Sequence, residues 1–288
     1  MSQGSPVVGW VGTGRIGLPM ARRVLAAGFP LAVWARRREG ADALVAGGAA
    51  FAVSPAALAK ESDIVMTIVG GPADVSALHA AMVPRARPGT VFVEMTTAAP
   101  ANAVESQALA ARFGALALDA PVTGGVAGAE RGSLTAFVGG DAPALERARP
   151  VLAAFANRIA HCGAAGSGYR MKLVNQTIVA GVLLGLAGGA ALARSGGLPA
   201  PAVRDALSAG TASGFLFDAY LARMMEGGGG TTFTLAMLRK DLSLAREDAA
   251  ARACSTRLID FALAEVDAAR LRHGDVAGVQ VLGAPGPE

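Results

Sequence analysis

Three glycines near the N-terminus have the spacing of a phosphate-binding loop. Gly12, Gly14 and Gly17 stand in the sequence Gly-Thr-Gly-Arg-Ile-Gly, directly after the apolar run at 7–11. In a strand–turn–helix, the first glycine allows the tight turn, the second leaves room for a pyrophosphate and the third lets helix and strand pack closely. The start of the helix adds unpaired N–H groups and the positive end of its dipole. We therefore predict a dinucleotide site, although a plain turn is the alternative in a chain with 38 glycines. The expected contacts are Gly12, Thr13, Gly14, Arg15, Ile16 and Gly17.

The residues that end the second strand should decide which dinucleotide is bound. An acid about 20 residues after the loop would bind the ribose 2′-hydroxyl of NAD. Here the chain has Arg36, Arg37 and Arg38, and the first carboxylate, Glu39, follows them. A guanidinium can bind a 2′-phosphate in a fork. We expect NADP to be preferred over NAD, with Arg36 and Arg37 as ligands. The alternative is that Arg37 and Arg38 form a solvated face and only Arg36 matters.

Lysine is rare in this chain, because only Lys60, Lys172 and Lys240 occur among 26 basic residues. A lysine can lose its proton when it is desolvated, whereas arginine effectively cannot. Lys172 begins an apolar helical segment, and Asn175 follows three residues later on the same face. An amine and an amide could therefore act together on one ligand. A charged residue at the surface end of a helix is the alternative for Lys172.

A second glycine-containing loop, Asp-Ala-Pro-Val-Thr-Gly-Gly at 119–125, follows an expected strand. The hydroxyl of Thr123 and the N–H groups of Gly124 and Gly125 could form a small anion-binding concavity. A plain turn is the alternative. The three histidines are scattered and make no Ser/His/Asp arrangement.

Composition excludes several other classes of protein. The chain of 288 residues is 52% hydrophobic and 17% charged, with a formal net charge of +4, so disorder is not expected. Aromatic residues make up only 5%, and no basic run is interleaved with them, so we expect no nucleic-acid partner. The two cysteines, Cys162 and Cys254, form no CxxC or His/Cys cluster, so we expect neither a disulfide framework nor a metal site. The first residues do not resemble a secretory signal, and we expect a cytoplasmic protein.

The elements that must hold these residues change in kind along the chain. Short apolar runs alternate with helix-period segments up to residue 163, which is typical of βαβ units around a parallel sheet. The expected strands are 7–11, 31–34, 64–69, 91–95, 116–120, 135–138 and 158–161, with a poorer one near 50–53. Beyond 168 only helices are expected, at 169–194, 201–208, 215–225, 235–253 and 256–272. We predict a dinucleotide-binding Rossmann-type domain at 1–163 and an all-helical domain for substrate binding and oligomerisation at 164–288, joined by a long helix.

That long helix contains an uncharged stretch, 173–193, which a hydropathy plot would flag as a membrane span. Polar residues occupy its first turn, which leaves the polar-free part short of 18 residues. Small residues at Gly181, Gly185 and Gly189 would allow close helix packing in lipid or in a soluble core. We expect a buried helix of a soluble protein and no membrane partner.

Four blocks together resemble the β-hydroxyacid dehydrogenases, the group that contains 3-hydroxyisobutyrate dehydrogenase, tartronate semialdehyde reductase and glyoxylate/succinic semialdehyde reductase. The blocks are residues 9–20, 119–125, 168–175 and 240–245. The resemblance implies a Rossmann-type domain and a helical domain of the kind found in 6-phosphogluconate dehydrogenase, with the active site between them.

The resemblance also implies roles for particular residues. Lys172 matches the catalytic lysine and Asn175 the asparagine that orients the substrate, while Thr123, Gly124 and Gly125 match the residues that hold the substrate carboxylate. Thr97 matches a contact to the nicotinamide half of the cofactor, and Lys240 a position that contacts cofactor and substrate. We also expect Val69 and Gly70, where the 64–69 strand ends, to contact the cofactor.

The chain departs from the usual pattern at several positions. Thr123 replaces a serine, Ile16 a methionine, and Gln176 a second asparagine, while Gly70 and Gly71 replace a Leu-Pro or similar pair. These changes leave the chemistry intact but put the identity of the substrate in doubt.

The resulting expectation is an NADP-dependent oxidoreductase that interconverts a small β-hydroxy acid and its semialdehyde. The substrate would be of the 3-hydroxyisobutyrate, tartronate semialdehyde, glyoxylate or succinic semialdehyde class, and Lys172 would act as general acid and base. The alternatives are an imine reductase on the same scaffold and a dinucleotide-binding protein without turnover. Apolar faces on the helical domain suggest a homodimer or homotetramer.

Overall fold

The computed structural model describes residues 4–227 and 233–284. The chain divides into two compact units, Met1–Lys172 and Leu173–Glu288, and the division falls inside one long helix. Each unit is built around a core of its own.

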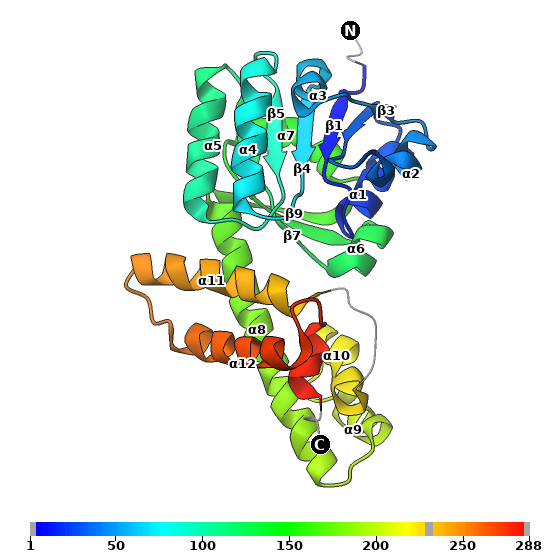
Figure 1. Ribbon diagram of the computed structural model, residues 1–288, viewed down its shortest axis with the longest axis vertical. Coiled ribbons are helices and arrows are strands. Elements are labelled where there is room, and N and C mark those ends of the chain that lie inside the picture. Colours follow the sequence, from blue (N-terminus) through cyan, green and yellow to red (C-terminus); the bar gives the residue numbers. More distant parts are fainter. Residues whose placement is uncertain (1–3, 228–232, 285–288) are drawn as a thin grey trace. The chain divides into compact units, whose positions relative to one another are not determined.

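A nine-stranded sheet forms the centre of the first unit (Figure 1). Its strands run in the order β3-β2-β1-β4-β5-β6-β8-β7, with β9 beside β8. The sheet is parallel as expected from β3 to β6, but β8 lies antiparallel to β6 and β7, and β9 runs parallel to β8. The strands are β1 (Val8–Val11), β2 (Leu31–Trp34), β3 (Ala50–Phe51), β4 (Ile64–Thr67), β5 (Val91–Glu94), β6 (Leu116–Asp119), β7 (Val122–Thr123), β8 (Leu134–Gly139) and β9 (Ala156–Gly163).

Helices cover both faces of this sheet, which is why every residue of its central strands β1, β4 and β5 is buried. Alternate residues of the strands join two different cores: Trp10, Met66 and Val93 pack in one, and Val65 and Phe92 in the other. The first core also contains residues of α1 and α7, and the second contains residues of α3, α4 and α5. The helices of this unit are α1 (Gly17–Ala26), α2 (Asp42–Val45), α3 (Pro55–Glu61), α4 (Pro72–Met82), α5 (Pro100–Arg112), α6 (Gly125–Arg131) and α7 (Ala142–Leu152), with short 3₁₀ turns at Arg38–Gly40 and Val83–Arg85.

The start of α3 illustrates how local sequence sets these boundaries. Ser54 has extended backbone angles and accepts a hydrogen bond from the N–H of Ala57 through its side chain, and Pro55 is the first helical residue. Both are typical helix-start signals. The local sequence therefore sets where α3 begins.

The second unit is helical as expected. It consists of most of α8 (Ser167–Ser195), α9 (Ala200–Ser208), α10 (Phe215–Glu226), α11 (Leu235–Ala251), α12 (Arg257–His273) and the 3₁₀ turn Val279–Gly283. An isolated β-bridge joins Thr234 to Gly278. Leu183, Met224, Leu238 and Val266 lie at the centre of its core.

The helix α8 is not buried on all sides. Leu183 and Ala190 face the core, whereas Ile178, Val182 and Leu192 are exposed. Among the described residues it is the one helix whose length and composition would suit a membrane span, and 33% of its most apolar window is buried. The expectation of a buried helix is therefore met on the core side of α8 only.

Candidate active site

The glycine loop lies between β1 and α1, as the spacing predicted. Gly12 has a φ of +108°, and a Cβ there would overlap the carbonyl oxygen of Ile68. A Cβ at Gly17 would overlap the carbonyl oxygen of Gly12. A Cβ at Gly14 would instead stand in open space, with no atom within 4 Å. The protein's own packing therefore requires the first and third glycines, while the second borders a space that a phosphate could occupy.

The start of α1 suits an anion. The first turn of the helix contains no acidic residue, and no side chain caps its N–H groups. Trp10 fixes the loop from beneath, because its indole N–H donates to the carbonyl oxygen of Gly12 over 2.8 Å and its side chain is fully buried. Sequence reasoning missed Trp10, since a tryptophan within an apolar strand carries no signal of such a bond. The loop can therefore hold the phosphates of a dinucleotide at a helix start.

The arginines after β2 do not share one environment. Arg36 is 80% exposed, and its guanidinium pairs with Asp74 of α4 over 2.9 Å. Arg38 lies 4.7 Å from the centre of the Phe51 ring, a cation–π contact. Arg37 is exposed. A Cβ at Gly40 would lie 2.7 Å from the Thr13 hydroxyl, so this segment runs directly beside the glycine loop.

Three polar residues end neighbouring strands at the carboxyl edge of the sheet. Thr67 of β4, Glu94 of β5 and Asp119 of β6 are in register with one another. Residues in register on parallel strands point to the same face, so these buried side chains form a row. In an open α/β sheet, ligands bind at this edge.

Asp119 fixes the start of α8. Its two carboxylate oxygens accept hydrogen bonds from the N–H groups of Gly166, at 2.9 Å, and Tyr169, at 2.7 Å. Burial raises the pKa of Asp119, and these bonds oppose the rise. At Gly168 a Cβ would overlap the carbonyl oxygen of Phe137, so the helix start is pressed against the sheet. Lys172 follows one turn later, and its side chain is only 8% exposed.

The expected substrate loop contains two short elements rather than a plain turn. Thr123 closes β7 and is half-buried. Gly124 and Gly125 have φ angles of +125° and +68°, and α6 begins at Gly125. A Cβ at Gly125 would meet nothing within 4 Å. A Cβ at Gly124 would lie 3.0 Å from the Leu134 side chain, so only Gly125 borders open space, where a backbone N–H group can bind an anion.

The segments after β4 and β5 are joined by one bond. Val69 is half-buried, Gly70 is exposed, and Thr97 is half-buried. The N–H of Val69 donates to the Thr96 hydroxyl oxygen over 2.8 Å. The residues expected to contact the cofactor therefore lie on two segments held side by side.

The second unit holds Asn175 and Lys240 in one network. The Asn175 amide donates to Gln176 over 2.8 Å, and the Gln176 amide donates to Asp241 over 2.6 Å. The amine of Lys240 lies 3.1 Å from the other oxygen of Asp241. Gln176 and Asp241 are buried. Sequence reasoning noted Gln176 only as a departure, and the network identifies it as the link between α8 and α11.

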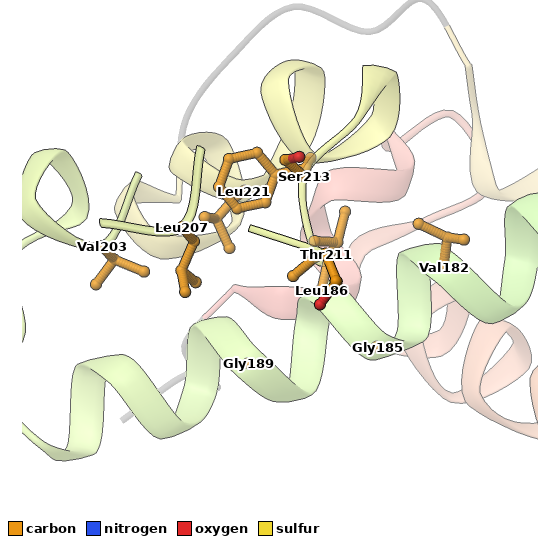
Figure 2. A pocket seen from close by; sticks show the side chains of 11 residues that line it. Val182, Gly185, Leu186, Gly189, Val203, Leu207, Thr211, Ser213 and Leu221 are labelled. Carbon is orange, nitrogen blue, oxygen red and sulfur yellow. The ribbon is translucent and has the colours of Figure 1, made fainter. Parts of the chain in front are cut away.

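A cavity of about 400 Å³ lies elsewhere in the second unit (Figure 2). It is lined mainly by apolar side chains of α8, α9 and α10, including Val182, Leu186, Val203 and Leu221. None of the expected site residues lines it. In the part of the chain that the structure describes, no three His, Cys, Asp or Glu side chains are grouped to hold a metal ion.

Comparison with known proteins matches both units to dehydrogenase families. Residues 7–163 match the NAD binding domain of 6-phosphogluconate dehydrogenase, and residues 166–281 match the NAD-binding domain of NADP-dependent 3-hydroxyisobutyrate dehydrogenase. The NAD-dependent L-serine dehydrogenase of Pseudomonas aeruginosa is 34% identical over 270 residues, which cover 89% of each chain.

Solved structures agree with these matches. The Mycobacterium tuberculosis 3-hydroxyisobutyrate dehydrogenase with L-serine is similar at a TM-score of 0.87 and 30% identity, over 96% of this chain and 98% of that one. Psf3 in complex with NADP+ and 2-OPP gives a TM-score of 0.88 at 28% identity, with the same coverage. An imine reductase from Pseudomonas sp., at 19% identity and a TM-score of 0.64, over 96% of this chain and 98% of that one, shares the fold alone. The chain belongs to the β-hydroxyacid dehydrogenase family of NAD(P)-dependent oxidoreductases.

Proposed function

We propose that this chain is an NADP-dependent oxidoreductase that interconverts a small β-hydroxy acid and its semialdehyde, with Lys172 as general acid and base. The observation that carries the proposal is the position of Lys172. Its side chain is buried and lies one helical turn after Gly168. At this point Asp119 and the close packing of Gly168 fix the start of α8 against the sheet edge. A catalytic group must be held in place by its surroundings, and burial restricts the side chain of Lys172.

Each residue has a definite task in this mechanism. A bound nicotinamide supplies or accepts the hydride. In reduction the Lys172 ammonium gives a proton to the carbonyl oxygen, and in oxidation the neutral amine takes the proton of the hydroxyl. Thr123 and the N–H groups of Gly124 and Gly125 hold the substrate carboxylate, and Asn175 orients the reacting group. Lys240 contacts cofactor and substrate, Thr97 contacts the nicotinamide half of the cofactor, and Val69 and Gly70 also contact the cofactor.

The preference for NADP rests on Arg36 and Arg37. Both residues are exposed and precede Gly40, which lies beside Thr13 of the glycine loop, so a 2′-phosphate could bind them. Arg36 must exchange its bond to Asp74 for the phosphate, or share it. One relative is named NAD-dependent, while the family that matches the second unit is described as NADP-dependent, so the arginines and not the family support this choice.

The substrate class is inferred from what the relatives' named compounds share. L-serine and 3-hydroxyisobutyrate each carry a carboxylate and a hydroxyl group on the β-carbon. A carboxylate site at Thr123 and a proton carrier at Lys172 suit that pair of groups. We therefore propose a small carboxylate with a primary hydroxyl group at the β position, or the corresponding aldehyde.

The deciding experiment changes Lys172 in two ways. Lys172→Ala should lower kcat by at least about 100-fold while NADPH still binds, because the proton carrier is lost. Lys172→Arg keeps the positive charge but cannot give up its proton, so it should be impaired as well. Lys60→Ala, at an exposed lysine in the last turn of α3, is the matched control.

The assay uses a panel of β-hydroxy acids, semialdehydes, glyoxylate and cyclic imines, each with NADPH and NADH. Unchanged turnover in Lys172→Ala would refute the assignment. Turnover of imines alone would favour an imine reductase, and no turnover with any compound would favour a binding protein.

We also propose that the chain is a cytoplasmic homodimer or homotetramer. The exposed apolar side of α8, with Ile178, Val182 and Leu192, supports association, since large exposed apolar patches mark interaction surfaces. Analytical ultracentrifugation without detergent tests both statements. A monomer in solution would refute the proposed oligomer, and a need for detergent would refute the proposed cytoplasmic location.

A further inference from the structure

Glu94 is a buried carboxyl group that the proposed mechanism does not use. It ends β5, and one of its oxygens accepts a hydrogen bond from the backbone N–H of Thr96 over 2.7 Å. The other oxygen accepts from the hydroxyl of Thr67, at the end of β4. Because a carboxylate offers two acceptor oxygens, it satisfies both donors at once.

These bonds continue into the segments that we assign to the cofactor. Thr96, whose N–H bonds to Glu94, accepts a hydrogen bond from the N–H of Val69 through its own hydroxyl oxygen. Val69 lies next to Gly70, and Thr96 lies next to Thr97. The positions of both segments therefore depend on the carboxyl group of Glu94. The three hydrogen bonds involved run from Thr67 and Thr96 to Glu94 and from Val69 to Thr96.

The groups that face Glu94 come from four elements. Thr67 lies on β4, Asp119 is its neighbour in register on β6, and the imidazole Nε2 of His79 on α4 is 3.9 Å from the Glu94 carboxylate. Tyr169 of α8 is close enough that Glu94 and Asp119 help to raise the pKa of its phenol, although burial is the larger cause.

Burial favours the uncharged forms of Glu94 and His79. It raises the pKa of Glu94 to about 7, against the opposing effect of the bonds from Thr67 and Thr96, and it lowers the pKa of His79 to about 4. At neutral pH the imidazole is uncharged, so the 3.9 Å contact is not an ion pair. The carboxyl group of Glu94 titrates in the range in which the protein would work.

We propose that Glu94 is a positioning residue for the nicotinamide half of the cofactor: its carboxylate holds Thr96 and Thr97, and through Thr96 also Val69 and Gly70, in the arrangement that binds the ring. This inference rests on the proposed assignment of Val69, Gly70 and Thr97 to the cofactor. It also implies a pH dependence, because a protonated Glu94 offers fewer acceptor sites to its two donors. Cofactor affinity should therefore rise as the pH rises through about 7.

The experiment measures the Kd of NADPH and of NADH from pH 6 to 9, by fluorescence titration without substrate. Glu94→Gln, which has one amide oxygen in place of two carboxylate oxygens, should weaken both cofactors about fivefold to tenfold at pH 8.5, where the wild type is ionised. At pH 6 the two proteins should bind about equally. The 2′-phosphate of NADPH titrates near this range, but its effect is common to both proteins and cancels in their ratio.

Two further variants separate positioning from general damage. Thr96→Val removes the acceptor for Val69 and should weaken both cofactors at every pH. Thr90→Val is the matched control: Thr90 is buried just before β5, at the opposite edge of the sheet, and its hydroxyl donates to the carbonyl oxygen of Ser62. It should lower the melting temperature and leave both Kd values within twofold.

The outcomes distinguish this inference from the proposed function. A ratio of Kd values between Glu94→Gln and wild type that does not change with pH would overturn the inference, as would an equal loss of affinity in Thr90→Val. Since the titration involves neither substrate nor Lys172, those results would leave the proposed reaction standing. If turnover fails in the substrate panel but the ratio changes with pH as expected, the proposed reaction is wrong and Glu94 keeps its role.

Discussion

At the edge of the sheet the buried polar side chains bond mainly to backbone groups, whereas between α8 and α11 they bond to one another. Asp119 and Glu94 accept bonds from the N–H groups of Gly166, Tyr169 and Thr96. In the second unit, Asn175, Gln176, Asp241 and Lys240 are joined from side chain to side chain.

This difference separates two ways of holding an active site. A side chain that bonds to backbone fixes the path of the chain, and every residue on that segment depends on it. Side chains that bond to one another fix each other's rotamers, and between α8 and α11 they also link two helices, but they do not set the path of a loop. We therefore expect changes at the sheet edge to affect folding and cofactor binding together, and changes between α8 and α11 to affect mainly substrate contacts.

The largest effect should come from Asp119→Ala. It leaves the buried N–H groups of Gly166 and Tyr169 without their acceptor, which should cost roughly 3 kcal/mol of unfolding free energy. Because the start of α8 is released, kcat should also fall at least about tenfold. Urea denaturation and steady-state kinetics measure the two. A variant with wild-type kcat and a lowered stability would show that Lys172 does not depend on this bond.

The next effect is on stability in acid. The pKa of His79 is about 4 in the folded protein, below its ordinary value of 6.5, so the folded state binds fewer protons between these values and loses stability as the pH falls from 6.5 to 4. His79→Leu removes this loss, so its unfolding free energy should exceed that of wild type by up to roughly 3 kcal/mol at pH 4. Neither ring nitrogen of His79 has a hydrogen-bond partner among the described residues, so the variant should not be weaker at pH 7.

The contribution of Glu94 to stability should depend on pH in the opposite sense, which checks the account of His79 within the same protein. Its pKa is about 7 in the folded protein, above the ordinary 4.5, so the stability it contributes is present below pH 4.5 and is lost as the pH rises to 7. The unfolding free energy of Glu94→Gln should therefore rise relative to wild type as the pH rises from 4.5 to 7. That of His79→Leu should rise relative to wild type as the pH falls from 6.5 to 4. Thermal unfolding at each pH records both. Stability differences that stay constant with pH would contradict the account of this pair.

A smaller effect is expected from Asp241→Asn. It keeps the shape of the side chain but weakens the contact with Lys240 and the acceptor for Gln176, and so disturbs the rotamer of Asn175. We expect KM for the substrate to rise about tenfold, or about 1.4 kcal/mol, with the Kd of NADPH changed less. The reverse result, a change in cofactor affinity alone, would remove the contrast between the two networks.

The smallest effect should come from Asp74→Asn. It frees Arg36 from an exposed ion pair, and such pairs contribute under about 1 kcal/mol. The Kd of NADPH should fall about twofold to threefold and that of NADH should not change. Arg36→Ala is the companion, and it should weaken NADPH more than NADH. Equal effects on the two cofactors would remove the argument for NADP.

The sequence was most informative where the determinants are local. The glycine loop could be predicted because Gly12, Gly14 and Gly17 lie within six residues, between a strand and a helix. The cap at Ser54 is equally local. The alternation of strands and helices, and the change to helices alone, also follow from short-range periodicity, which is why the fold class was confirmed.

The features that could not be predicted from the sequence join residues that are far apart in the chain. Asp119 bonds to N–H groups 47 and 50 residues away, and Gln176 to a carboxylate 65 residues away. No local pattern indicates such partners. The antiparallel direction of β8 was missed for a related reason, since an apolar run has the same composition in either direction. The two-residue strand β7 is too short to show any period.

The glycine loop also indicates how this lineage could lose its activity. Gly12 and Gly17 are constrained by the protein's own packing, whereas a Cβ at Gly14 would meet no atom of the protein within 4 Å, so only a ligand constrains that position. In a descendant that no longer needs its cofactor, selection on foldability would retain the two outer glycines while the middle one drifts. Homologues with a side chain at that single position would therefore be the first candidates for paralogues that have kept the scaffold and abandoned catalysis.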